Sequence, residues 1–153
     1  MKTLPITATE EQVKQWVREW IALLGEQRYE EAISWLHPNV SRYGQFDHWT
    51  AKRLQAIINN YGIEKPIPED TWVYQPIPVT EELREDFERN FSVGLPDSDD
   101  SDDYWGRDNM NIHVDLPLLH ESGEFISDVT ARMILRRVSE NEIGVELFDA
   151  HVM

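Results

Sequence analysis

The sequence predicts an α+β protein in which N-terminal helices pack on one face of an antiparallel sheet formed mainly by the C-terminal half. In the first half of the chain, apolar residues recur with the period of a helix. After residue 110 they alternate with polar residues, as in a strand that is covered on one face. The length of 153 residues suits one domain, so we treat 1–153 as a single unit.

The first helix is predicted after Thr9, because an apolar stripe follows that runs from Val13 to Leu24. Thr9 and Gln12 have the spacing of a capping box, and Gly25 is a natural end. A few residues on, "RYEEAISWLHP" predicts a second helix that Pro38 ends. The short connection indicates an antiparallel helical hairpin.

Two further helices are expected. One covers "HWTAKRLQAIINNYG", with Asp47 as its N-cap and Gly62 as its end. The other covers "EELREDFERNF" behind a Thr80 cap, because Leu83, Phe87 and Phe91 are spaced by four residues. Between them, 71–79 has strand-forming residues, but its two prolines restrict it to a sheet edge.

Three strands complete the chain. They are predicted over 111–119, 127–138 and 143–153, joined by polar turns at 120–127 and 139–142, and they form an antiparallel meander. One face of this sheet carries apolar residues. The other carries His113, Asp115, Arg132 and Arg136, with Ile134 among them.

Two stretches resemble known proteins. The paired helices of "WIALLGEQRYEEAISWL" before an antiparallel sheet resemble the NTF2-like (cystatin-like) superfamily. The C-terminal part, with "DLPL", "SDVTA" and "DAHV", resembles short uncharacterised bacterial proteins. The resemblance implies a curved sheet, a cone-shaped cavity between helices and sheet, and frequent dimerisation. It leaves function open, because such folds carry enzymes, ligand binders and interaction modules.

Composition narrows the function classes. The net charge of −15 disfavours nucleic acid and anionic membranes as partners. With no cysteine, the chain has no disulfide, thiol nucleophile or zinc–thiolate site. The N-terminus lacks the apolar run of a signal peptide, and we expect a cytoplasmic protein. No familiar catalytic motif is present, so we assign no catalytic residue, metal or cofactor.

The segment 97–109, "DSDDSDDYWGRDN", is the densest acidic stretch. An EF-hand loop beginning at Asp97 would need glycine at its sixth position, which is Asp102 here. Three interpretations stay open: a solvated or mobile loop, an acidic patch that faces a partner, and a weak cation site. The tentative binding residues are the five aspartates of the run, Asp97, Asp99, Asp100, Asp102 and Asp103.

A second candidate set lies on the predicted sheet. Alternation puts His113 and Asp115 on one face of the first strand, and Asp149 and His151 on one face of the last. Arg132, on the strand between, is placed to pair with Asp115 or Asp149. An ion-paired outer face explains these residues, and an interface with a partner or a second copy is the functional alternative.

The leading functional hypothesis is a non-catalytic acidic interaction protein. Residues 81–108 hold eleven acidic side chains and three arginines, a balance of −8, which favours a basic protein partner. Inhibition of a basic toxin, as bacterial immunity proteins perform, fits this charge. The alternative is a small-ligand-binding protein or an enzyme that uses the cone cavity, where aromatic rings such as Trp16 and Tyr29 would line the site.

Overall fold

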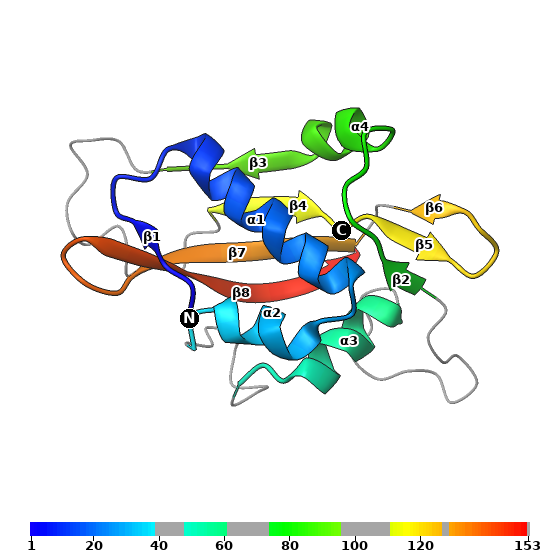
Figure 1. Ribbon diagram of the computed structural model, residues 1–153, viewed down its shortest axis with the longest axis horizontal. Helices are drawn as coiled ribbons and strands as arrows, with labels where there is room; N and C mark the ends of the chain where they lie inside the picture. Colours follow the sequence, from blue (N-terminus) through cyan, green and yellow to red (C-terminus); the bar gives the residue numbers. More distant parts are fainter. Residues whose placement is uncertain (39–47, 61–73, 96–110, 127–128, 153) are drawn as a thin grey trace.

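The structure is a computed structural model that describes residues 1–38, 48–60, 74–95, 111–126 and 129–152. The described chain is α+β, with helices and a strongly curled antiparallel sheet (Figure 1). Its helices are α1 (Glu10–Gly25), α2 (Tyr29–Trp35), α3 (Ala51–Asn59) and α4 (Arg84–Arg89).

The described strands form two antiparallel sheets, one of five strands in the order β1-β8-β7-β4-β3 and one of three in the order β2-β5-β6. The five-stranded sheet contains β1 (Leu4–Pro5), β3 (Phe91–Val93), β4 (Ile112–Asp115), β7 (Val129–Arg137) and β8 (Glu142–Val152). The small sheet contains β2 (Tyr74–Pro76), β5 (Leu118–His120) and β6 (Phe125–Ile126).

Helix α1 forms as the sequence predicts. Thr9 accepts from the Gln12 backbone N–H at 3.2 Å, and the Gln12 side chain accepts from the Thr9 N–H at 2.8 Å. These bonds satisfy two N–H groups that a helix start otherwise leaves unpaired. All residues of the predicted stripe are buried: Val13, Trp16, Val17, Trp20, Ile21 and Leu24.

The third and fourth helices begin later than predicted. Asp47 lies outside the described residues, and the side chain that caps α3 is Thr50, which accepts from the Arg53 N–H at 3.1 Å. Helix α4 begins at Arg84, and no side chain caps it, so the Thr80 cap was wrong. Helix α4 ends at Arg89, earlier than predicted, because Phe91 belongs to strand β3 and not to the helix.

The predicted strand over 111–119 divides at Leu116 and Pro117. Strand β4 pairs with β7, whereas β5 turns away to pair with β2 and β6. Pro117 has no N–H to donate to a ladder, which favours a break at this point. The region expected to be only a turn is therefore a hairpin, with Gly123 at φ +90° in its loop.

The β4–β7–β8 part of the sheet agrees with the predicted meander, and the edge position of β2 also agrees. The two-residue strand β1, which pairs Leu4 with Ile143, was not predicted. Between Arg132 and Met133 the β7–β8 register shifts by one residue. This β-bulge leaves Phe148 of β8 without a paired residue on β7.

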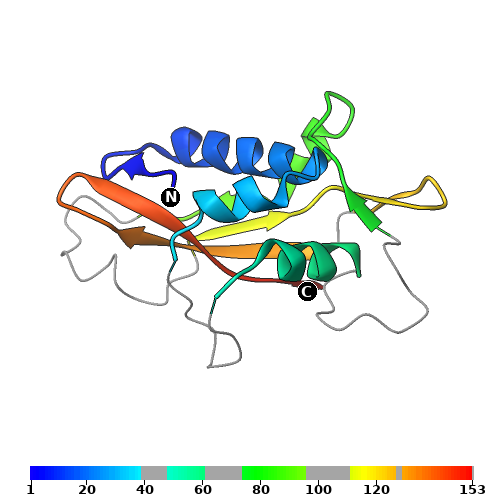
Figure 2. The ribbon, with the colours of Figure 1, turned by 60° about the horizontal axis from the view of Figure 1, so that its bottom comes forward.

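The apolar core gathers side chains from α1, α2, α3 and the curled sheet. Figure 2 shows α1 and α2 on one side of the long β7–β8 ribbon, with α3 beside β8. Three tryptophan N–H groups donate to backbone carbonyls: Trp16 to Lys2, Trp20 to Ala32 and Trp49 to Leu147. These bonds allow large rings to be buried without an unsatisfied donor.

Among the described residues, no helix has the length and apolar character needed to cross a membrane.

Candidate functional site

The five aspartates proposed for binding, from Asp97 to Asp103, lie outside the described residues. The other candidates lie on three neighbouring strands, as the alternation predicted. His113 on β4 and Asp149 on β8 flank Arg132, and Asp115 and His151 flank Thr130. The structure therefore brings these side chains onto one face of the sheet.

This sheet face is held by ion pairs and hydrogen bonds. Arg132 donates to both carboxylate oxygens of Asp149, with Nε 2.8 Å from Oδ1. His151 Nδ1 lies 3.2 Å from the same Asp149 oxygen. The Thr130 hydroxyl donates to Asp115 at 2.6 Å. Of the two cross-strand partners considered for Arg132, the structure shows Asp149.

Part of this face is buried, contrary to the expectation of an open outer surface. Ile134 is fully buried, and Phe148, whose ring centroid lies 5.2 Å from the Arg132 guanidinium carbon, is nearly so. Arg136, expected on the open face, is only 8% exposed, and its Nε donates to fully buried Glu146 at 2.6 Å. Ile134, which lies between Arg132 and Arg136 on this face, was the one sequence feature that indicated burial. The alternation of a strand does not show which other residues cover its face.

A small apolar cleft lies where α4 meets the β5–β6 hairpin. Its volume is about 110 Å³. Two carboxylates, Asp86 and Asp115, line it beside apolar side chains. Its apolar lining consists of Leu83, Phe87, Pro117, Leu118 and Phe125.

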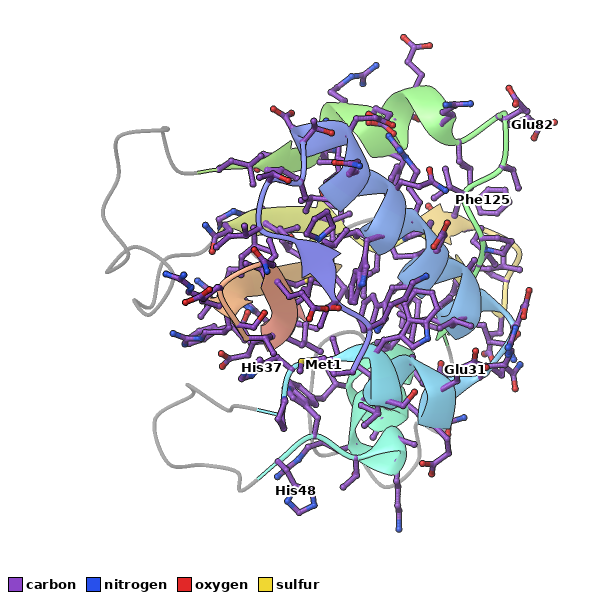
Figure 3. The ribbon with its side chains drawn as sticks, turned by 60° about the vertical axis from the view of Figure 1, so that its left-hand side comes forward. Met1, Glu31, His37, His48, Glu82 and Phe125 are labelled. Carbon is purple, nitrogen blue, oxygen red and sulfur yellow. The ribbon has the colours of Figure 1, made fainter. Side chains whose placement is uncertain are left out.

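The cleft has an exposed aromatic ring at one side. Phe125 is 56% exposed, although a phenyl ring gains about 1.5–3 kcal/mol from full burial. Figure 3 shows Phe125 and Glu82 projecting on the same side of the molecule. Sequence analysis missed Phe125 and Asp86, since only the tertiary arrangement brings α4 to the hairpin.

The acidic side chains of α4 divide into an anchored group and an exposed group. Glu88 contacts two cations of α1, with Arg18 Nη2 at 2.5 Å and Lys14 Nζ at 3.7 Å, and so fixes α4 to α1. Glu85 and Asp86 are 92% and 70% exposed, and Arg89 pairs with both. Exposed pairs of this kind contribute little, so their carboxylates remain available to another cation.

Comparison of the chain with models of protein families, with curated proteins and with solved structures found no significant match. Within the described ranges, no group of three or more His, Asp or Glu side chains is arranged to hold a metal ion.

Proposed function

We propose that the protein binds a basic protein partner through the cleft between α4 and the β5–β6 hairpin, without catalysing a reaction. One observation carries the proposal: Phe125 is left exposed beside an apolar cleft that two carboxylates line. An arginine or lysine side chain has a matching build, an aliphatic stem with a cation at its end. The stem would contact Leu83 and Phe125, and the cation would approach Asp86 and Asp115.

The charge around the cleft supports this choice of partner. In the described stretch 81–95, five acidic residues stand against Arg84 and Arg89. The five aspartates from 97 to 103 follow directly in the sequence. Clustered negative charge raises the rate at which a cationic surface is encountered. A role as an inhibitor of a basic toxin, of the immunity-protein type, belongs to this proposal.

The proposal includes the finer fold assignment. A curled antiparallel sheet packed against N-terminal helices is compatible with the NTF2-like superfamily, in which several members act as interaction modules. Trp16, Trp20 and Val17 of α1 and Met133 of the sheet are all buried in the apolar core. That filling favours recognition at the surface over a ligand within the cone.

The test is a nuclear magnetic resonance titration with two matched peptides, acetylated Gly-Leu-Arg-Leu-Gly amide and its Gly-Leu-Glu-Leu-Gly counterpart. We expect the arginine peptide alone to shift the amide signals of Phe125 and Leu118. The binding should weaken in the variants Phe125→Ser and Asp86→Asn, whereas Glu30→Gln on α2, an exposed acid away from the cleft, serves as the control. Equal shifts from both peptides, or shifts that spare the cleft, would refute the proposal.

A further inference from the structure

Strand β6 is an edge strand of the small sheet, and among the described residues it pairs only with β5. In Figure 1 it lies on the side of this sheet that faces α4, where the apolar cleft is. Its first residue is Phe125, which is 56% exposed. A strand edge offers backbone N–H and C=O groups to another chain. Strand β6 is therefore a place where a partner's backbone can bind, next to the cleft that would take its side chain.

The register of the β5–β6 hairpin shows which backbone groups face this edge. In an antiparallel ladder, residue pairs alternate between those that exchange hydrogen bonds and those that do not. The His120 N–H donates to the Glu124 carbonyl at 2.9 Å, so the next pair, Leu119 with Phe125, is one that does not exchange them. The N–H and C=O of Phe125 consequently point away from β5, toward the edge.

The pairing of β5 with β2 agrees with this register. The Ile77 N–H donates to the Pro117 carbonyl at 3.0 Å, and two residues further along the same ladder Gln75 pairs with Leu119. Because bonded pairs recur at every second residue, Gln75 and Leu119 are a bonded pair. The backbone groups of Leu119 are therefore directed to β2 and not to Phe125.

The charge around the edge favours a basic segment over a second copy of the chain. Glu121 and Glu124 are exposed on the hairpin, and Asp86 of α4 lines the cleft. If two copies paired through β6, carboxylates of one copy would approach carboxylates of the other, and like charges that face each other in a sheet are destabilising. A segment that carries arginine or lysine would meet opposite charges instead.

We propose that the basic partner adds an extended segment to the edge of β6, antiparallel to it, with one arginine or lysine directly opposite Phe125. This inference rests on the proposed function and specifies how the partner's backbone is held. The N–H of the basic residue donates to the Phe125 carbonyl, and its carbonyl accepts from the Phe125 N–H. Residues directly opposite each other share a face of the sheet, so the basic side chain lies on the same side as the Phe125 ring, which lines the cleft. Main-chain bonds supply affinity, and the cleft selects the side chain.

The experiment uses two N-methylated forms of the acetylated Gly-Leu-Arg-Leu-Gly amide, each added to the full chain. One form carries the methyl group on the arginine backbone nitrogen, and the other carries it on the nitrogen of the leucine that follows. In the proposed register the arginine N–H points at β6 and the leucine N–H points away from it. The arginine form should bind at least about tenfold more weakly than the unmodified peptide, because it loses one hydrogen bond and places a methyl group against the strand. The leucine form is the matched control and should bind within about twofold of the unmodified peptide, because it keeps both bonds.

Amide hydrogen exchange at Phe125 gives an independent readout. In the free protein this N–H has no partner in the described ladder and should exchange quickly. The Ile126 N–H faces β5, where Ile126 is paired with Leu118, and should already be protected. The unmodified peptide should slow exchange at Phe125 more than at Ile126.

The outcomes distinguish a failure of strand addition from a failure of the proposed function. If the unmodified peptide binds at the cleft but the two methylated forms bind equally well, strand addition is overturned and the proposed function is not. If the unmodified peptide does not bind, the proposed function fails, and strand addition fails with it. Exchange at Phe125 that slows with rising protein concentration, without peptide, would show a second copy on the edge and would also overturn the inference.

Discussion

At the residue scale, the protein buries polar groups in two ways with opposite consequences. Arg136 and Glu146 meet across β7 and β8, where each charge offsets the cost of burying the other. Tyr29 and Asn59 keep unpaired atoms within the described structure. The first arrangement stabilises the fold, whereas the second lowers stability.

The buried ion pair gives a stability prediction. Glu146→Gln keeps the shape of the side chain but removes the carboxylate that faces Arg136, so the guanidinium keeps its burial and loses an opposite charge. Urea denaturation should show a loss of about 3 kcal/mol in the free energy of unfolding. Glu85→Gln breaks the exposed Glu85–Arg89 pair and is the control, with an expected change within about 0.5 kcal/mol. Equal losses in the two variants would contradict the assignment.

His37 gives a prediction for pH. Burial lowers its pKa, nearby Glu146 opposes this effect and Arg136 adds to it. The folded protein therefore binds the proton less tightly than the unfolded chain, whose histidines titrate near 6.5. The contribution of His37 to stability is complete above that value and is lost as the pH falls through the lower, folded-state pKa.

The measurement is the urea midpoint at about pH 7.5 and about pH 5.5, on either side of the ordinary histidine pKa. The wild type should lose more stability between these values than His37→Gln, which keeps the backbone bond from His37 N to the Val145 carbonyl. Identical losses would show that His37 does not titrate with folding.

At the element scale, the sequence predicted the features that depend on interactions within one helix or strand. The capping box of Thr9 and Gln12 and the apolar stripe of α1 are interactions within one helix, and both are present. Phe87 and Phe91 are four residues apart, as on a helix, and their rings are in contact, with the centroids 5.2 Å apart. The contact nevertheless crosses from α4 to β3, because pairing with β4 takes Phe91 into the sheet.

The candidate site was harder to predict, because most of it depends on contacts between elements that are distant in the sequence. The alternation of β4, β7 and β8 gave the ion-paired sheet face, since the period of a strand is a local property. The cleft depends on how α4 packs against a hairpin far along the chain. The periodicity of a sequence does not show which elements far apart along the chain pack together.

Gly25 provides a prediction for the packing of α1. A Cβ atom there would lie 2.7 Å from the Pro78 nitrogen and 2.8 Å from its Cδ. Alanine gains up to about 1 kcal/mol in helix propensity, but such overpacking against backbone costs about 1–3 kcal/mol. Gly25→Ala should therefore lower the thermal midpoint.

The matched control is Gly94→Ala, where the nearest atom to an added Cβ, the Asn111 oxygen, is 3.9 Å away. Gly94→Ala should change the midpoint little. A Gly25→Ala protein that is more stable than the wild type would show that the approach of Pro78 does not constrain α1.

At the scale of the whole molecule, the acidic helix α4 and the exposed Phe125 ring border the same cleft. The acidic segment 81–108 carries −8 of the net −15, and helix α4 within it is fixed to α1 through Glu88. Anchoring by Glu88 holds Asp86 and Phe87 in place beside Phe125. In the proposed function, the acidic side chains of α4 beside the apolar cleft would steer a cationic partner toward it and add specificity.

The most direct test is the association rate of the fluorescently labelled arginine peptide at about 10 mM and about 300 mM salt, since salt screens long-range attraction. The account predicts a fast rate at low salt that falls several-fold at high salt. It also predicts a slower low-salt rate when Asp86 and the aspartates from Asp97 to Asp103 are reversed to lysine, with Glu30→Lys as the control. Low-salt rates that are the same in the wild type and the reversed variant would contradict the central claim.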